Sequence, residues 1–339
     1  MIFSKTIKLI KELTNVIFIS IVIISCTDSV SEDLGSDEPT FKFDYTVQYN
    51  DLDMFKTDSL SYEIAYNMSG FNEIDLTINI DSLFYKSLTI RNEDSLDYVY
   101  ADKIPLSNNG IDVSMSFAYN DSVIAENYHN VPVIKPIKTL TLSLGRNGTY
   151  FDRLFDKSKF IINDNIIFDQ FTNYDFGEVD IVIINELDTI SDKTIVQLQK
   201  FLLGNGWIFV VMNDDIKSNN DLYYSLGYPK GKAIRGSSRN QFFSIDRNEF
   251  LSRYSFSSQK LVKQSEIYRY FQFKNNENEF ANIMISTGDP LLIEKDILGG
   301  KIFFLTTKTD SNWSNDTFNK LLDNMLHTIF FQRLLSNES

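Results

Sequence analysis

The residues best suited to chemistry are few in this sequence. Its 339 residues hold one cysteine, Cys26, and two histidines, His129 and His327. A zinc site needs three or four ligands from histidine, cysteine and carboxylate, and no cluster in the sequence supplies them. His327 follows Asp323 by four residues, a spacing that predicts an exposed pair on one face of a helix rather than a catalytic base. We therefore expect no metal, no cofactor and no catalytic histidine.

Three other polar features could bind a charged ligand. Asp51 with Asp53 and Asp214 with Asp215 form acidic pairs, but the Asp-x-Asp-x-Asp-Gly loop of a calcium site is missing, so we predict solvated turns. Residues 230–236 are a small basic segment that could meet an anion, and we interpret them as a flexible loop. The sequence also lacks glycine-rich phosphate-binding loops and the Gly-x-Ser-x-Gly turn of serine hydrolases.

Cys26 lies where a lipid anchor would be attached. Three lysines among the first eleven residues precede an apolar run, residues 16–25, which ends at the cysteine. A basic start and a short apolar run are typical of a secretory signal, and the run is about half the ~20 residues of a membrane-spanning helix. Residues 23–26, Ile-Ile-Ser-Cys, resemble a bacterial lipobox, which implies cleavage before Cys26 and acylation of its thiol. The alternative is an ordinary signal peptide that ends in an incidental cysteine.

Two or three acyl chains on one residue hold a protein stably on a bilayer. We therefore expect the mature chain to be lipid-anchored in the bacterial cell envelope, at the outer rather than the inner membrane. Residues 26–40 are polar, acidic and free of aromatic side chains, so we predict a disordered tether. The net charge of −14 makes nucleic acid a poor candidate partner, because an acidic surface repels phosphate backbones.

Residues 41–136 alternate between apolar and polar side chains, as strands do when one face is buried. Clear examples are residues 41–47 and residues 74–80. Turn-forming residues such as Asn108-Asn109-Gly110 separate the runs. About seven short strands within ~100 residues is the pattern of an immunoglobulin-like β-sandwich, which we predict for this part of the chain.

Residues 137–335 show a different pattern, that of an α/β domain. Residues 180–185 and 207–212 are continuous apolar runs, as expected for strands buried on both faces of a parallel sheet. Ser191 is placed to cap a helix between them, so the order is strand, helix, strand. The signal weakens over residues 213–280, which we interpret as insertions. A hairpin around Gly299-Gly300 and a final amphipathic helix complete a multidomain β and α/β fold.

Several stretches of the α/β part resemble the C-terminal region of aerotolerance-regulator (Bat-type) membrane proteins. They are residues 179–187, 198–206, 288–292 and 310–314, the last reading Asp-Ser-Asn-Trp-Ser before an apolar helix. The resemblance implies an immunoglobulin-like sandwich followed by a domain similar to class I glutamine amidotransferases, with a flavodoxin-like fold. It also implies protein partners in the envelope. Members of that family usually begin with two transmembrane helices and an integrin-like A-domain, and here a lipid anchor stands in their place.

The amidotransferase resemblance implies a cysteine nucleophile on the turn after a buried strand, with a histidine as base. The strand over residues 208–211 should deliver that nucleophile, which places Met212 or Asn213 in the slot. Neither side chain carries a thiol, and no glycine is present to relieve strain at the turn. We interpret the slot as degenerate and predict that the chain is not an enzyme.

These observations favour a non-catalytic envelope lipoprotein that acts by protein contacts in an aerotolerance (Bat-type) system. The alternative is a surface lipoprotein that binds glycans through exposed aromatic side chains, with Tyr223-Tyr224, residues 268–271 and Trp313 as candidates. A third interpretation is a hydrolase with an unrecognised carboxylate site. Paired titratable groups at the carboxyl ends of the sheet strands would keep the enzyme interpretation open, and their absence would remove it.

Overall fold

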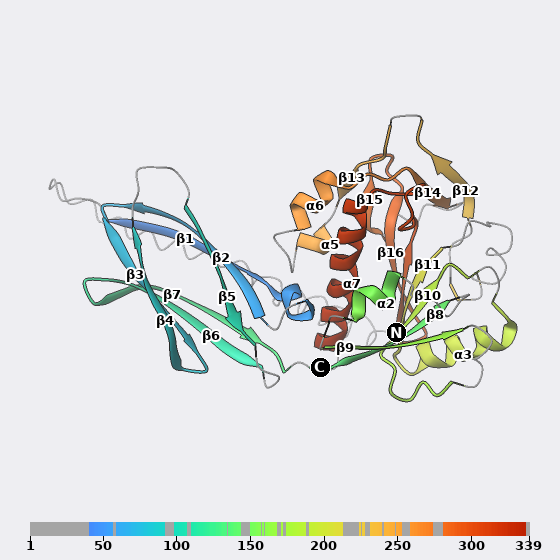
Figure 1. Cartoon of the computed structure of the whole chain (residues 1–339), viewed down its shortest axis with the longest axis horizontal. Helices are drawn as coiled ribbons and strands as arrows, with labels where there is room; N and C mark the ends of the chain where they lie inside the picture. The colour runs from blue at the N-terminus through green and yellow to red at the C-terminus, as the bar shows by residue number, and fades with distance from the viewer. Residues whose placement is uncertain are drawn as a thin grey trace, which may run out of the picture. The chain divides into compact units, whose positions relative to one another are not determined.

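The structure is a computed structural model, shown in Figure 1, and it describes part of the chain. The described residues are 41–56, 59–91, 98–106, 110–133, 135–143, 150–156, 158, 160–167, 171, 174–187, 190–212, 224, 226–227, 231–238, 241–247, 249–252, 258–273 and 281–336. Cys26, with the predicted signal and tether, lies outside them. Among the described residues, no helix is long and apolar enough to cross a membrane.

Seven antiparallel strands form two sheets in the first part of the described chain. The three-stranded sheet has the order β1-β2-β5 and the four-stranded sheet the order β4-β3-β6-β7. Their bounds are β1 Lys42–Asn50, β2 Ser59–Ser69, β3 Glu73–Ile80, β4 Leu83–Arg91, β5 Tyr98–Pro105, β6 Ile111–Tyr119 and β7 Ser122–Val131. The alternation in the sequence therefore predicts the strands of this region.

The two sheets bury the apolar half of that alternation between them. Ile64 and Leu60 of β2, Leu76 of β3 and Met115 of β6 are fully buried. Each such side chain contributes about 1.5–3 kcal/mol relative to an exposed one. Side chains also join the sheets at both edges: Tyr45 donates to the carbonyl oxygen of Glu126 at 2.6 Å, and Lys86 of β4 pairs with Asp102 of β5. In the four-stranded sheet, β4 and β7 are the edge strands, and these two bonds link each of them to the other sheet.

The second part of the chain is built on an eight-stranded sheet (Figure 1). Among the described strands its order is β13-β15-β16-β17-β11-β10-β8-β9, and the five from β17 to β9 run parallel. The bounds are β8 Ile137–Ser143, β9 Ile161–Ile167, β10 Ile181–Asn185, β11 Trp207–Val211, β13 Ile245–Arg247, β15 Ala281–Ile285, β16 Pro290–Ile297 and β17 Gly300–Leu305. The predicted buried strands and the hairpin around Gly299-Gly300 are confirmed.

Helices cover both faces of this sheet. α3 (Asp192–Leu203) packs on one face, and α2 (Tyr150–Phe155) with α7 (Asp316–Ser336) packs on the other. The sequence predicts α3 well, because the Ser191 hydroxyl accepts a hydrogen bond from the Thr194 amide at 3.2 Å and the helix ends at Gly204. α7 is also found, but it is buried around most of its circumference, so its pattern is less one-sided than an amphipathic surface helix.

The region of weak sequence signal contains regular structure. β12 (Gly231–Gly236) pairs with β14 (Arg269–Phe273) as a small antiparallel sheet. Between them in the sequence come two short helices, α5 (Glu249–Ser252) and α6 (Ser258–Gln264), which contact each other and α7. The prediction of a flexible loop over residues 230–236 is therefore wrong. Its backbone partners come from β14, far away in the sequence, and local composition carries no trace of such a pairing.

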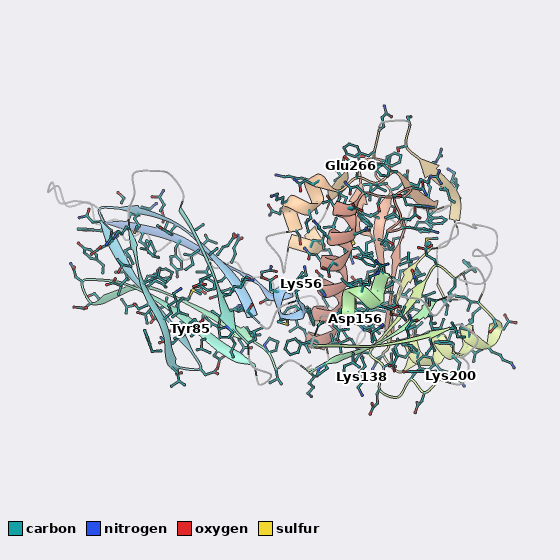
Figure 2. The ribbon with its side chains drawn as sticks, viewed as in Figure 1. Lys56, Tyr85, Lys138, Asp156, Lys200 and Glu266 are labelled. Atoms are coloured by element: carbon teal, nitrogen blue, oxygen red, sulfur yellow. The ribbon has the colours of Figure 1, made fainter. Side chains whose placement is uncertain are left out.

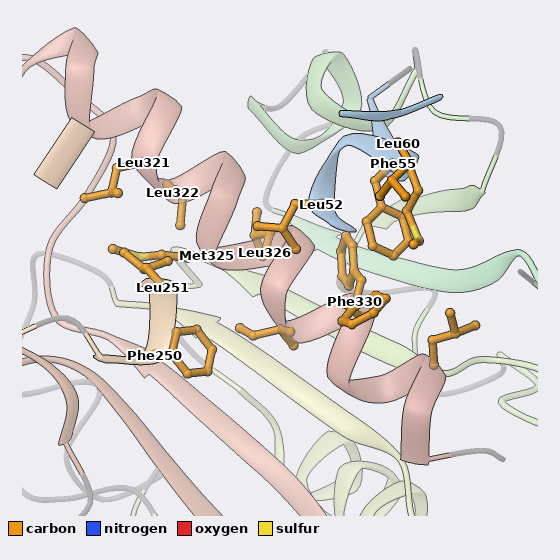
Figure 3. Close-up of a cluster of buried hydrophobic side chains, with 14 of the residues drawn as sticks. Leu52, Phe55, Leu60, Phe250, Leu251, Leu321, Leu322, Met325, Leu326 and Phe330 are labelled. Carbon is orange, nitrogen blue, oxygen red and sulfur yellow. The ribbon is translucent and has the colours of Figure 1, made fainter. Parts of the chain in front are cut away.

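A short 3-10 helix, η1 (Asp51–Phe55), contacts α7 (Figure 3). Leu52 and Phe55 of η1 are buried in the same apolar cluster as Leu326 and Phe330 of α7. The acidic residues of η1 are not solvated turns, as the sequence had suggested. Asp51 lies 2.9 Å from a ring nitrogen of His129, and Asp53 accepts a hydrogen bond from Asn50 at 2.9 Å.

Candidate functional site

The carboxyl ends of the parallel strands form the edge where a ligand is expected. In open α/β sheets, ligands bind outside these ends, at the point where the strand order reverses. Here β9 lies on one side of β8, and β10, β11 and β17 lie on the other, so the reversal falls between β8 and β10. The residues at this edge are Ser143, the last residue of β8, and the residues that directly follow the other strands: Glu186 after β10, Met212 after β11 and Thr306 after β17.

Met212 directly follows β11, the position predicted for the degenerate nucleophile slot. Its side chain is 3% exposed and packs in the apolar cluster on the α3 face of the sheet. Asn213, the other candidate for the slot, lies outside the described residues, as do Asp214 and Asp215. The assignment of this turn to a lost nucleophile remains a prediction.

A buried ion pair lies beside Met212 along the same edge. The ammonium group of Lys308 is 2.9 Å from a carboxylate oxygen of Glu186, and the lysine side chain is only 3% exposed. The Lys308 ammonium also lies 5.3 Å from the centre of the Trp313 ring, close enough for a cation–π contact. Ser314 donates to the Lys308 carbonyl oxygen at 2.6 Å. The lysine is thus fixed from several sides.

The backbone of Glu186, the acidic residue of this pair, adopts an uncommon conformation. Its φ is +53°, in the left-handed region that non-glycine residues rarely occupy, and its amide donates to the Val211 carbonyl oxygen at 3.0 Å. Such strain costs of order 1–3 kcal/mol and is concentrated at functional sites. This edge therefore combines a strained backbone with a buried ion pair, where the sequence had suggested only a lost thiol.

Sequence reasoning missed the Glu186–Lys308 pair because 122 residues separate its members. Glu186 directly follows one buried strand, and Lys308 comes three residues after another. The position of each residue just after a buried strand becomes informative only when the strand order β10-β11-β17 is known, because that order brings the two strand ends to one edge.

A cavity of about 600 Å³ opens next to Trp313. Its lining residues are Gly236, Ser237, Ser238, Gln241, Phe242, Glu266, Tyr268, Arg269 and Asn312. The amides of Tyr268 and Arg269 donate to the Trp313 carbonyl oxygen at 2.8 and 3.2 Å. Trp313 therefore connects the cavity with the buried ion pair, because its ring lies over Lys308 and its main chain supports the cavity wall.

The cavity contains charged groups of both signs. Tyr268 donates its hydroxyl hydrogen to a Glu266 carboxylate oxygen at 2.6 Å, and this bond raises the pKa of Tyr268 (Glu266 is labelled in Figure 2). The Arg269 side chain is exposed, and within the described part of the chain its guanidinium makes no hydrogen bond and no ion pair. The ring of Phe242 is 49% exposed.

A second cavity of about 620 Å³ lies at the opposite, amino edge of the sheet, between the segment before β10 and helix α3. Its walls include the carboxylates of Asp175, Glu178 and Asp180. The Nε of Arg333 lies 3.6 Å from an Asp180 carboxylate oxygen, and its guanidinium is 5.6 Å from the centre of the Trp207 ring. Burial lowers the pKa of Arg333, and Asp180 opposes that effect.

The two histidines lie away from both cavities. His129 packs flat against Tyr49, with ring centres 3.9 Å apart, and its Nε2 meets Asp51. His327 is 2% exposed, so the prediction of an exposed helix pair with Asp323 is wrong, although their side chains do approach to 3.1 Å. Burial holds the pKa of His327 well below its ordinary value. The error arose because α7 is covered on the side where the sequence pattern suggested solvent.

The aromatic residues proposed as a glycan platform are mostly core residues. Trp313, Tyr270 and Phe271 are buried, and Phe271 stacks on Trp313 with ring centres 5.4 Å apart. Tyr224 is exposed, and Tyr223 lies outside the described residues. Both faces of β14 are covered, and a sequence that alternates along a strand does not reveal such double coverage.

Exposed aromatic side chains are found instead on the four-stranded sheet, where sequence reasoning did not look for them. Register pairs Phe84 with Asn79, Asn79 with Ser114, and Ser114 with Tyr128, so the four residues form one row across the sheet. Phe84 is 69% and Tyr128 71% exposed. Leu83, Phe84 and Tyr85 are three consecutive exposed apolar residues at the start of the edge strand β4 (Tyr85 is labelled in Figure 2).

Comparison with known proteins gives only distant structural similarity. No protein-family model matches the sequence, and no curated protein matches it. A β-galactosidase from Rahnella sp. R3 is similar to the chain with a TM-score of 0.39 and 11% identity, over 59% of this chain and 32% of the enzyme. The β-galactosidase of Bacillus circulans sp. alkalophilus gives 0.38 and 13%, over 58% and 31%. A ThuA-like protein from Bacteroides uniformis gives 0.37 and 12%, over 57% and 92%.

The prediction that this chain is not an enzyme is contradicted by these neighbours, because four of them are β-galactosidases. The prediction rested on the missing thiol at Met212, which excludes a cysteine nucleophile there. Motifs of zinc, phosphate-binding and serine-hydrolase sites were also missing, but a hydrolase with an unrecognised carboxylate site had been left open. The chain spans about a third of the length of these enzymes, and so distant a likeness assigns it no reaction.

Proposed function

We propose that this chain is a lipid-anchored protein of the bacterial cell envelope that acts by contacts with partner proteins in an aerotolerance (Bat-type) system. Its thiol Cys26 is the attachment point, at the outer membrane. The basic start, the short apolar run and the lipobox-like residues 23–26 support the anchor. The stretches similar to Bat-type proteins support the choice of partners.

The proposal includes an immunoglobulin-like sandwich followed by a glutamine amidotransferase-like domain. Seven antiparallel strands in two sheets support the first assignment. For the second, the parallel strands taken in chain order lie as 2-1-3-4-5, the order of flavodoxin-like sheets, with helices on both faces. The Met212 turn would then be the position of the lost nucleophile.

The observation that carries the contact function is the run Leu83-Phe84-Tyr85 on β4. We call these three residues the β4 apolar run. Their side chains are exposed, and β4 is an edge strand of its sheet, with β3 as its one hydrogen-bonded neighbour among the described strands. Exposed edge strands with apolar side chains invite pairing with another chain, and soluble proteins avoid them unless they serve an interface. A partner protein that covers this run would bury that surface.

The anchor is tested by Cys26→Ala with membrane fractionation of whole cells. We expect the parent in the membrane fraction, carrying label from a fed fatty acid, and the variant unlabelled and displaced from the membrane. Ser25→Ala serves as a matched control, because it changes the neighbouring residue and leaves the thiol. An unlabelled parent, or a variant that stays as membrane-bound as the parent, would remove the lipoprotein proposal.

A second function, glycan binding, is favoured by one specific observation. Phe84 and Tyr128 stand at the two ends of one cross-strand row, three strand spacings or about 14 Å apart, with polar Asn79 and Ser114 between them. Aromatic faces at the ends of a polar strip could stack on a sugar chain. Tyr128→Ser should abolish retention on polysaccharide if glycans bind here, and Leu83→Ser should not. Protein contact at the β4 apolar run predicts the reverse sensitivity for partner binding.

A further inference from the structure

The cavity beside Trp313 has walls that are held in place by hydrogen bonds. The Ser237 amide donates to the Tyr268 carbonyl oxygen at 2.8 Å, and the Asn312 amide donates to an Asp310 carboxylate oxygen at 2.8 Å. Both backbone polar groups of Glu266 are hydrogen-bonded to Asn315: the Glu266 amide donates to the Asn315 side-chain oxygen at 3.2 Å, and the Glu266 carbonyl oxygen accepts from the Asn315 backbone amide at 3.1 Å. A pocket fixed in this way needs little ordering when a ligand enters.

Arg269 is a charged residue of this cavity whose guanidinium forms no hydrogen bond or ion pair with the described residues. A guanidinium carries five N–H donors in a planar fork that matches a carboxylate or phosphate. Glu266 has its Tyr268 hydrogen bond on one oxygen, Oε2, and its other oxygen can accept from a ligand hydroxyl. The described lining of the cavity therefore includes a cationic guanidinium and an anionic carboxylate.

The remaining lining groups are those that recognise hydroxyl groups. Gln241 and Asn312 contribute amides, and Ser237 and Ser238 contribute hydroxyls, each able to donate and accept. The half-exposed ring of Phe242 offers an apolar face in the same wall. A volume of about 600 Å³ lies within the ~300–1,000 Å³ typical of small-molecule sites.

We propose that this cavity binds a sugar acid, a small ligand with several hydroxyl groups and one carboxylate. Arg269 pairs with the ligand carboxylate. The Glu266 carboxylate accepts hydrogen bonds from the ligand hydroxyls, and the amides of Gln241 and Asn312 donate to or accept from them. A sugar phosphate is disfavoured, because its second negative charge would face Glu266 in a chain of net charge −14. The proposal goes beyond the envelope-contact function and does not depend on it, since the β4 apolar run takes no part.

Calorimetric titration of the purified full-length chain in detergent tests the proposal. D-galacturonate and D-glucuronate are the probes, with D-galactose as the neutral analogue and D-galactose 6-phosphate as the dianionic one. We expect a uronate to bind at least about tenfold more tightly than either analogue, the range for one charged hydrogen-bonded pair. No binding of either uronate at millimolar concentration would overturn the proposal, and so would equal affinity for galactose.

Substitutions then assign the binding to this cavity. Arg269→Gln should lower uronate affinity about tenfold, to that of the neutral sugar, while circular dichroism shows the same fold because the side chain is exposed. Arg235→Gln is the matched control, because Arg235 is an exposed arginine that donates to Gln272 and lies outside the cavity lining. Unchanged affinity in Arg269→Gln, or an equal loss in Arg235→Gln, would contradict the assignment.

Discussion

The outer face of the four-stranded sheet and the carboxyl edge of the eight-stranded sheet are built in opposite ways. On the first, aromatic side chains such as Phe84 and Tyr128 are exposed to solvent. On the second, a charged side chain, Lys308, is buried against Glu186 and Trp313. Exposed apolar surface suits a broad contact with another macromolecule, whereas buried charge beside a polar cavity suits a small polar ligand. The chain thus has two surfaces of different chemistry that it can use independently.

The largest expected effect comes from the buried charge. Lys308→Ala breaks the ion pair with Glu186 and should lower the free energy of unfolding by about 3 kcal/mol, the lower end of the range for a broken buried pair, because Glu186 is partly exposed. Urea unfolding measures the change. Lys263→Ala, at an exposed lysine of α6, should leave stability within about 0.5 kcal/mol. Equal stability of the two variants would show that the edge pair contributes nothing.

A smaller effect should follow pH, through the contact between η1 and α7. His327 is buried, and its pKa is lowered by burial and by Lys56, so the folded chain keeps it neutral where the unfolded chain binds a proton. Stability should therefore be lost as pH falls below about 6.5, by at most about 1.4 kcal/mol per pH unit. The pKa of the neighbouring Asp323 is raised, so that carboxyl contributes with the opposite sign, at lower pH.

The variant His327→Phe isolates this effect. It removes the titrating group and retains an aromatic ring against Phe55, whose ring centre lies 5.4 Å from that of His327. Unfolding of the variant should lose the dependence on pH between about 5 and 6.5. A parent whose stability is flat over that range would contradict the assignment of a neutral buried histidine.

The sequence predicts local structure here better than it predicts surfaces. Ser191 and Gly204 mark the ends of α3, and continuous apolar runs mark β10 and β11, because caps and burial leave local signals. The ion pair of Glu186 with Lys308 leaves none, since strand order alone brings its members together. Exposure of Leu83 and burial of Trp313 likewise depend on which faces other elements cover, which periodicity within one strand cannot show.

The central claim, that the chain contacts a partner protein through the β4 apolar run, is tested most directly by photo-crosslinking in intact cells. Phe84 is replaced by benzoylphenylalanine, and Leu203, an exposed apolar residue of α3, receives the same replacement as the control. We predict an adduct at position 84 with an A-domain protein of the Bat type, lost when Leu83→Ser is added, and no such adduct at position 203. The absence of an adduct at 84, or equal yields at both positions, would contradict the account.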